Sequence, residues 1–275
     1  MPDPGNGRSR ADLHIHTVAS DGTATVTAIL DHVELQTDLA VIAIADHERI
    51  DAAVAARAMA RDRGLRVEVV VGEEVTTLGG HLLALFIDRP IRPYRSLRAT
   101  IAAVHDAGGL AIPAHPLVPY PLCAQGWVLR RLLDDPDPAV HPDALETFNP
   151  TTLGRPAHRR ATQFADDRGL AHVGNSDAHA LAAIASGWTL FPGHDAADLR
   201  RAILDRTTEH GGAFHPTVGQ LGTFGQQLRK RGRDARDEVG GRLRRDGTGR
   251  DHGYPGGRLR PPRFEPTGPQ ERHRP

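Results

Sequence analysis

Residues 40–45 read Ala-Val-Ile-Ala-Ile-Ala, a continuous apolar run without a polar position that could face water. Such a run is typical of a strand that is buried on both faces, as in a parallel sheet covered by helices. Other short apolar runs at 11–16, 66–71, 81–87, 110–114, 144–148 and 171–174 alternate with helix-period segments. This alternation predicts parallel pairing with right-handed crossovers. A closed barrel is the expected arrangement, and an open doubly wound sheet is the alternative.

The charge of the chain is unevenly distributed. Its formal net charge is zero, yet residues 221–275 contain 14 Arg and Lys against 7 Asp and Glu, a net of +7. Glycine, arginine and proline dominate after about residue 217, and apolar residues become sparse. We therefore expect a flexible N-terminus at 1–10, a barrel domain at 11–216 and a disordered basic tail at 217–275. A solvated tail is the favoured interpretation, with nucleic-acid or anionic-surface binding as the alternative.

Several features bear on where the chain resides. Its one cysteine, Cys123, allows no disulfide within the chain and no cysteine-rich zinc motif. The first ten residues lack the apolar run of a signal peptide. No stretch approaches the roughly 18 to 20 apolar residues of a membrane span. We expect a soluble, cytoplasmic protein.

Histidines and carboxylates stand where the predicted strands end, and these are the positions at which barrels gather functional residues. They include the His14-Ile15-His16 triplet after the first strand, Asp46-His47 after the second, Glu73-Glu74, His115-Pro116 and Asp177-Ala178-His179. Strand alternation places His14 and His16 on one side, about 6 to 7 Å apart. Nitrogen and oxygen donors without sulfur suit zinc, manganese or iron and fit magnesium poorly. The sequence therefore predicts a metal site.

Four motifs make the chain similar to a known family. They are Asp12-Leu13-His14-Ile15-His16-Thr17 with Ser20-Asp21-Gly22-Thr23, then Ala45-Asp46-His47, Ala114-His115-Pro116, and Ser176-Asp177-Ala178-His179. In this order they resemble the motifs of the PHP superfamily, named for polymerase and histidinol phosphatase. The resemblance covers residues 11–204.

The resemblance implies a distorted (β/α)7 barrel that holds two or three divalent metal ions (Zn, Mn or Fe). The first metal would be held by His14, His16, Glu74 and Asp177. The second would be held by Glu74, His81 and His115, with Glu74 bridging, and the third by Asp21, His47 and His179. Glu73 is the less favoured bridge, because the motif places the ligand two residues after the glycine and the two glutamates would point to opposite sides of a strand.

Two departures from the family pattern concern the rim of the site. Glu48-Arg49 follows His47, where the family has a further Asp and a small residue. This change adds a guanidinium that can bind phosphate. Asp21 stands where some relatives have His, which lowers the expected occupancy of the third metal.

The implied reaction is hydrolysis of a phosphate ester of a small molecule or nucleotide by a hydroxide bridging two metals. Asp21 or His179 would protonate the leaving oxygen where the third metal is absent. Arg49 and Arg155 are candidates for binding the substrate phosphate, with surface salt bridges as their alternative. Asn149 would line the pocket or serve as a turn residue before Pro150.

Two other functions stay open. One is an exonuclease acting on nucleic-acid ends, with the basic tail holding a strand. The other is a non-catalytic, metal-stabilised domain that binds a partner, for which a broken ligand set would be expected.

We interpret Trp127 and Trp188 as packing residues. His32, His105, His158, His172 and His194 lie away from strand ends and are expected to be structural or exposed.

Overall fold

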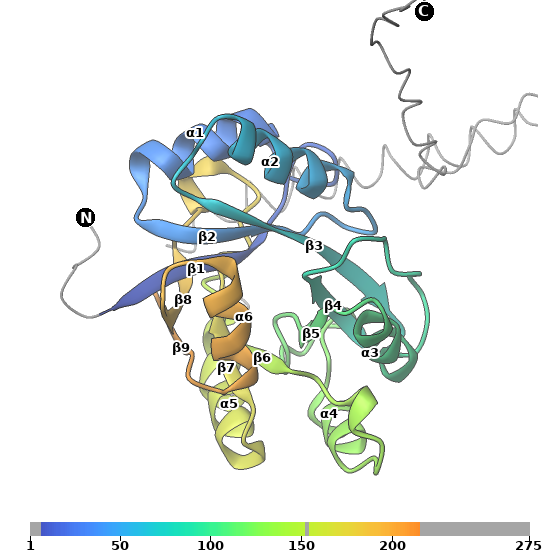
Figure 1. Cartoon of the computed structure of the whole chain (residues 1–275). Helices are drawn as coiled ribbons and strands as arrows, with labels where there is room; N and C mark the ends of the chain where they lie inside the picture. The colour runs from blue at the N-terminus through green and yellow to red at the C-terminus, as the bar shows by residue number, and fades with distance from the viewer. Residues whose placement is uncertain (1–6, 152–153, 215–275) are drawn as a thin grey trace, which may run out of the picture.

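The computed structural model describes residues 7–151 and 154–214, which form a mixed α/β fold (Figure 1). Its elements are β1 (Arg8–Ile15), α1 (Val26–Gln36), β2 (Leu39–Ile44), α2 (Asp51–Asp62), β3 (Glu68–Thr77), β4 (Gly80–Leu85), α3 (Leu97–Asp106), β5 (Leu110–Pro113), α4 (Gly126–Leu133), β6 (Ala144–Phe148), α5 (Gly154–Arg168), β7 (Ala171–Gly174), β8 (Gly187–Pro192), α6 (Ala196–Leu204) and β9 (Glu209–Gly212).

The first seven strands correspond to the apolar runs predicted from the sequence, with shifts at their ends. The first strand begins at Arg8, inside the segment expected to be a flexible N-terminus. The predicted tail at 217–275 lies outside the described residues, so the division of the chain into three parts stays a prediction. No helix in the described part is long and apolar enough to cross a membrane.

The sheet topology differs from the expected all-parallel arrangement. Seven strands follow the order β5-β4-β3-β2-β1-β8-β9, and β6 pairs with β7 in a second sheet. The β1–β2, β2–β3 and β6–β7 pairs are parallel, whereas β4 is antiparallel to β3 and β5, and β8 is antiparallel to β1 and β9. The prediction of parallel pairing throughout was therefore wrong. The physical reason is clear between β3 and β4, where a two-residue connection leaves room only for a hairpin. Gly80 at its end has φ +122°, which favours glycine.

The two sheets form a curled half-barrel. Beyond the end of β1, His16 N–H donates to Ala178 O at 2.9 Å, and Ala178 N–H donates to His14 O at 3.1 Å. On its other side, Ala45 N–H donates to Ile15 O at 2.9 Å. The segment after β7 is thus held beside the end of β1, and the segment after β2 lies on the opposite side. Three of the sequence motifs become neighbours in space.

Two apolar clusters lie on opposite faces of the curled sheet. Along β2, Ile42 and Ile44 belong to one cluster, while Val41 and Ala43 belong to the other. The first cluster is covered by α1 and α2, which pack together on one side of β2 and β3 in Figure 1. The second is enclosed by strands and by α6. The prediction of a strand buried on both faces is confirmed for residues 41–45, whereas Ala40 is half-buried.

Local signals place several helices. Thr25 caps α1 by accepting a hydrogen bond from Ala28 N, and Ser96 caps α3 by accepting one from Ala99 N.

The two tryptophans differ in how much of each side chain is exposed. Trp188 packs against the apolar core and under Arg10. Trp127 is 65% exposed, so the interpretation of Trp127 as a packing residue was wrong.

Adjacent glutamates on β3 point in different directions. Glu73 Oε2 accepts a hydrogen bond from Ile91 N at 2.8 Å, whereas Glu74 faces the histidines described below. Glu73 is fully buried, and burial raises its pKa from 4.5 to about 8, with Glu48 adding to the shift. The structure therefore directs Glu73 away from the candidate metal ligands, as strand alternation predicts.

This raised pKa predicts a pH-dependent stability. A folded-state pKa above the unfolded one contributes stability that is present below pH 4.5 and is lost as pH rises to about 8. The side chain in Glu73→Gln cannot ionise, so this variant should not lose stability over this pH range. Its free energy of unfolding should exceed that of the wild type by up to about 5 kcal/mol at the upper end of the range. Urea unfolding at several pH values measures the difference. A difference that is independent of pH would contradict the assignment.

Candidate metal centre

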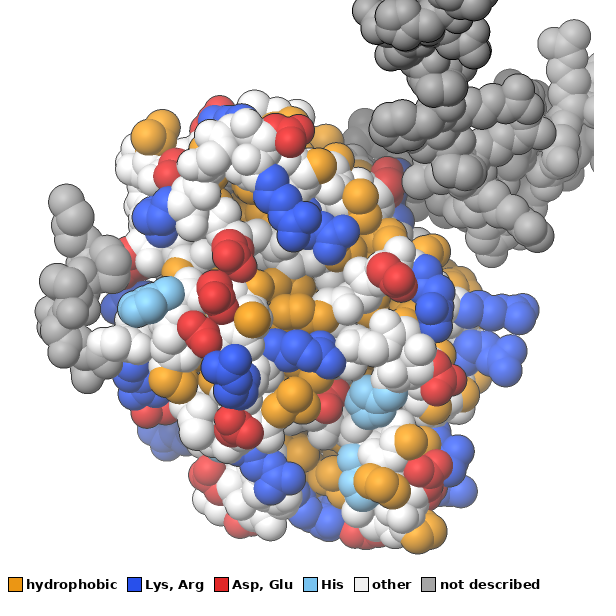
Figure 2. Space-filling model, in the orientation of Figure 1, with side chains coloured by type: hydrophobic (Ala, Val, Ile, Leu, Met, Phe, Trp, Pro, Cys, Tyr) orange, Lys and Arg blue, Asp and Glu red, His pale blue; other side chains and the backbone are white. Residues whose placement is uncertain are grey.

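The nine predicted ligands come from separate segments and meet in one buried cluster at the end of β1. They are His14, His16, Asp21, His47, Glu74, His81, His115, Asp177 and His179. Figure 2 shows acidic and basic side chains interspersed over one face of the molecule, with few histidines among them. Within the cluster, His14 is 0% and Glu74 is 2% exposed.

Glu74 lies at the middle of the cluster, and its two oxygens face different imidazoles. Oε2 lies 3.4 Å from His14 Nε2 and 3.4 Å from His16 Nε2. Oε1 lies 2.7 Å from His81 Nδ1 and 3.1 Å from His115 Nε2. A carboxylate in this position can bridge two cations.

The first group of predicted ligands is completed by Asp177. Its Oδ1 lies 3.5 Å from His14 Nε2 and 3.4 Å from His16 Nε2. One donor atom from each of these three residues can be chosen so that all lie within 4.8 Å of one another. The ring centroids of the two histidines are 5.1 Å apart. The pair therefore converges on one point, although the β1–β2 register is irregular between Asp12 and Ile15.

A second acidic residue, Asp21, organises the remaining histidines. Its Oδ1 lies 3.2 Å from His179 Nε2, and its Oδ2 lies 3.5 Å from His47 Nε2. His16 Nδ1 also approaches Asp21 Oδ1 at 3.5 Å. These four residues form one group of potential ligands, and His47, Glu74 and His81 form another. The groups share members, so the cluster is continuous.

The donor set fits divalent cations. Among the described residues, three buried ring nitrogens of the cluster have no hydrogen-bond partner, namely His14 Nε2, His16 Nε2 and His81 Nδ1. Leaving a buried polar atom unpaired costs about 1 to 3 kcal/mol. All three nitrogens lie close to Glu74 oxygens, so a cation between them would satisfy both partners. Imidazole and carboxylate donors suit zinc, manganese or iron.

The protonation states of Glu74 and His16 agree with this fit. Burial lowers the pKa values of His14 and His115, but nearby groups that include the Glu74 carboxylate outweigh it and raise both values, and a bound cation would displace these protons. Burial raises the pKa of Glu74, but His81, His47 and His14 outweigh it and hold the pKa well below its usual range. Burial, reinforced by His179, lowers the pKa of His16 to about 4, which leaves this imidazole neutral. Ionised carboxylates and a neutral imidazole are the forms that bind metals.

Two other carboxylates hold the loops that carry the ligands. Asp46 accepts hydrogen bonds from Thr17 N at 2.8 Å and Thr17 Oγ1 at 2.7 Å, and also from Ser20 Oγ. These bonds fix the loop that leads to Asp21. Asp12 accepts from Ser176 N at 3.0 Å and so holds the segment before Asp177. Neither carboxylate was predicted to have a role, although the positions of Asp12 and Asp46 inside two of the motifs were an available signal.

Glu146 was also left without a role, although it lies near the end of a predicted strand. It is 1% exposed and contacts His14 Nδ1 at 3.0 Å. Burial raises its pKa, but His14 outweighs burial and the net shift is downward. The carboxylate therefore lies ionised behind the cluster.

The three predicted substrate-binding residues are not all brought to the cluster. Asn149 Nδ2 donates to Asp177 Oδ2 at 3.3 Å. Arg49 instead forms an ion pair with Asp51 at 2.6 Å and donates to Ala19 O. This is the salt bridge considered as its alternative.

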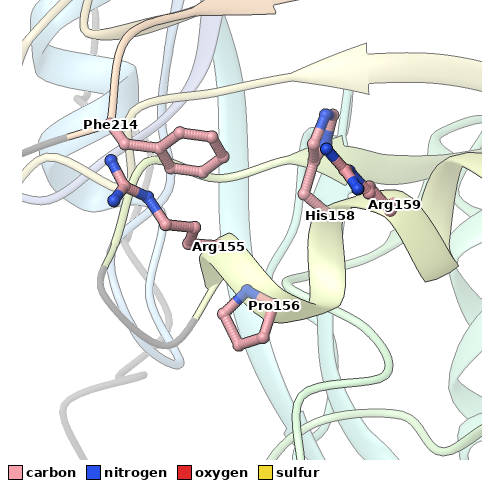
Figure 3. A pocket seen from close by; sticks show the side chains of 5 residues that line it. All are labelled: Arg155, Pro156, His158, Arg159 and Phe214. Carbon is pink, nitrogen blue, oxygen red and sulfur yellow. The ribbon is translucent and has the colours of Figure 1, made fainter.

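Arg155 lies at the start of α5 in a separate pocket. Its guanidinium lies 4.9 Å from the Phe214 ring centroid. Figure 3 shows this pocket, which is lined by Arg155, Pro156, His158, Arg159 and Phe214. His158 also lines a narrow cavity beside His115, Glu146 and Asn149. The two pockets are therefore adjacent through one shared side chain.

Comparison with known proteins gives matches of two kinds. A family model described as PHP-associated matches residues 155–208. An uncharacterized protein of Methanocaldococcus jannaschii is 35% identical over 120 residues, which cover 40% of this chain and 69% of that protein.

Solved structures share the fold. A two-domain protein from Bacteroides vulgatus, described as containing a predicted PHP-like metal-dependent phosphoesterase, matches with a TM-score of 0.61 at 18% identity. The match covers 75% of this chain and 65% of the Bacteroides protein, slightly less than two thirds of its length. A protein from Bifidobacterium adolescentis, described as a candidate metal-dependent phosphoesterase, matches with a TM-score of 0.52 at 19% identity, over 76% of this chain and 98% of that one. With the four motifs and the fold, these matches show that the chain belongs to the PHP superfamily.

Proposed function

We propose that this protein is a metal-dependent phosphoesterase that hydrolyses a phosphate ester of a small molecule or nucleotide. The observation that carries the proposal is the buried Glu74 carboxylate, with imidazoles facing both of its oxygens. A bridging carboxylate of this kind suits a centre that holds two cations close together. The complete set of nine donors argues against a non-catalytic domain.

The ligand assignment follows the groups in the cluster. We propose that His14, His16, Glu74 and Asp177 hold one ion, and that Glu74, His81 and His115 hold a second. Asp21, His47 and His179 would hold a third. Divalent ions bound there, whether zinc, manganese or iron, lower the pKa of water and neutralise phosphate charge.

The chain's own residues would supply the proton for the leaving oxygen. Burial lowers the pKa of His179, but Asp21 and Asp177 outweigh it and the net shift is upward. Burial raises the pKa of Asp21, but His179 and His47 outweigh it, so the net shift is downward. His179 would therefore hold the proton at Nε2, 3.2 Å from Asp21 Oδ1, when the third group binds no ion. Asp21 would orient the ring.

Substrate binding is proposed for the adjacent polar groups. Asn149 presents its amide beside Asp177. Arg155 and Arg159 bring positive charge to the pocket that borders the cluster through His158. Arg49 would have to release Asp51 before it could bind a phosphate, so it is the weaker candidate.

The fold is part of the same proposal. Strands β1 to β7 would correspond to the seven strands of a distorted (β/α)7 barrel, with β4 reversed. The hydrogen bonds between β1 and the segment after β7 support closure at the end that carries the cluster.

The metal ligands can be tested directly. We expect His14→Ala and Asp177→Ala to lower bound metal and to reduce phosphatase activity by more than about 100-fold, because losing a ligand costs more than losing an outer partner. Elemental analysis and turnover of p-nitrophenyl phosphate measure the two effects. His105→Ala is the matched control, since His105 bonds Asp143 and Ala139 away from the cluster. Unchanged metal content in both variants would refute the assignment.

An exonuclease is the second candidate, favoured by the net charge of +7 in residues 221–275. If the tail holds a nucleic-acid strand, removing residues 218–275 should weaken oligonucleotide binding and flatten its dependence on salt. Turnover of p-nitrophenyl phosphate should stay within about two-fold, because the nine ligands lie before the tail. Fluorescence anisotropy over a range of salt concentrations measures the binding. Equal affinities and slopes for both chains would remove the support for this candidate.

A further inference from the structure

Glu146 accepts four hydrogen bonds in the space behind the cluster. Its Oε1 accepts from His14 Nδ1 at 3.0 Å and from Asn175 Nδ2 at 2.8 Å. Its Oε2 accepts from the main-chain nitrogen of His115 at 2.6 Å and from Asn149 Nδ2 at 3.2 Å. Four donors around a buried carboxylate fix its position closely.

One oxygen determines which ring nitrogen of His14 faces the cluster. When Nδ1–H donates to Glu146, the neutral ring carries its lone pair on Nε2. Nε2 lies 3.4 Å from Glu74 Oε2 and 3.5 Å from Asp177 Oδ1. A carboxylate behind a metal-binding histidine sets the tautomer and the orientation of the ring in this way.

The other oxygen acts on the main chain of His115. His115 has φ +32°, a conformation that residues other than glycine rarely adopt. The hydrogen bond from its main-chain nitrogen to Glu146 holds this conformation. The imidazole then reaches Glu74, with Nε2 3.1 Å from Oε1.

We infer that Glu146 is a positioning residue that couples the two proposed metal sites, because one carboxylate orients His14 of the first and anchors His115 of the second. The inference rests on the proposed metal centre. It adds a residue that none of the three ligand groups contains. Removing the carboxylate should therefore weaken both sites together.

Glu146→Gln is the informative substitution, because it preserves shape and changes only hydrogen bonding. All four partners donate, so the new amide NH2 must face a donor in either orientation. If it faces Nδ1 of His14, that nitrogen must become the acceptor, and the neutral ring then carries its proton on Nε2. Glu73→Gln is the matched control, since Glu73 is also fully buried but bonds Ile91 on the other side of β3.

The test is Zn²⁺ affinity, measured by competition with a chromophoric chelator. We expect Glu146→Gln to lose about 10- to 100-fold in affinity at both sites of the pair. Glu73→Gln should stay within about two-fold of the wild type, because the Glu73 side chain bonds Ile91 and is directed away from the ligands. Wild-type affinity in Glu146→Gln, or a loss confined to one site, would overturn the coupling.

A second measurement needs only the zinc-loaded wild-type protein, so it stands even where Glu146→Gln does not fold. Nitrogen-15 NMR of the histidine rings should show His14 with a slowly exchanging proton on Nδ1 and with zinc on Nε2. Zinc on Nδ1 would overturn the inference. Both readouts are independent of turnover. Tight zinc binding without ester hydrolysis would therefore refute the proposed function while leaving this inference intact.

Discussion

The whole site depends on backbone pairing beyond the end of β1. Ile15 and its neighbours bond to Ala45 on one side and to Ala178 on the other. The segment after β2 also pairs with β3, because Glu74 N–H donates to Asp46 O at 3.2 Å. These main-chain bonds place segments from four parts of the chain next to each other. The side chains of the cluster converge because the backbone that carries them is already paired.

The cost of burying so many ionisable groups shapes the rest of the centre. Glu74 is 2% exposed and the Asp177 side chain is 14% exposed, and each is stabilised as a carboxylate by surrounding histidines. Burial of a charge is tolerated only where it is paired and hydrogen-bonded. Three ring nitrogens of the cluster, among the described residues, nevertheless lack hydrogen-bond partners, so protein groups alone leave the cluster incomplete. Divalent cations would complete the pairing, and binding them would displace protons from the histidines.

Much of this arrangement was predictable because it depends on local pattern. A few consecutive residues are enough to recognise the buried run at 40–45, the caps at Thr25 and Ser96, and the histidines and carboxylates at strand ends. The hairpin between β3 and β4 was missed, because periodicity gives strand length but not direction. Strand β9, with the sequence Glu-His-Gly-Gly, was missed because it carries no apolar run, whereas Trp-Thr-Leu-Phe in β8 was an available signal that was overlooked. Three of the four partners of Glu146 are 29 to 132 residues away in the sequence, so its role cannot be recognised from neighbouring residues.

The central claim is that two cations share Glu74. X-ray absorption spectroscopy of the zinc-loaded protein tests it most directly. The account predicts only nitrogen and oxygen ligands at about 2.0 to 2.2 Å, together with a metal–metal distance of about 3.5 to 4 Å. Cys123 lies 3.1 Å from His115 Nδ1, so a sulfur contribution would be detected if the thiol were a ligand. A sulfur ligand, or a single zinc without a metal neighbour at saturation, would contradict the account.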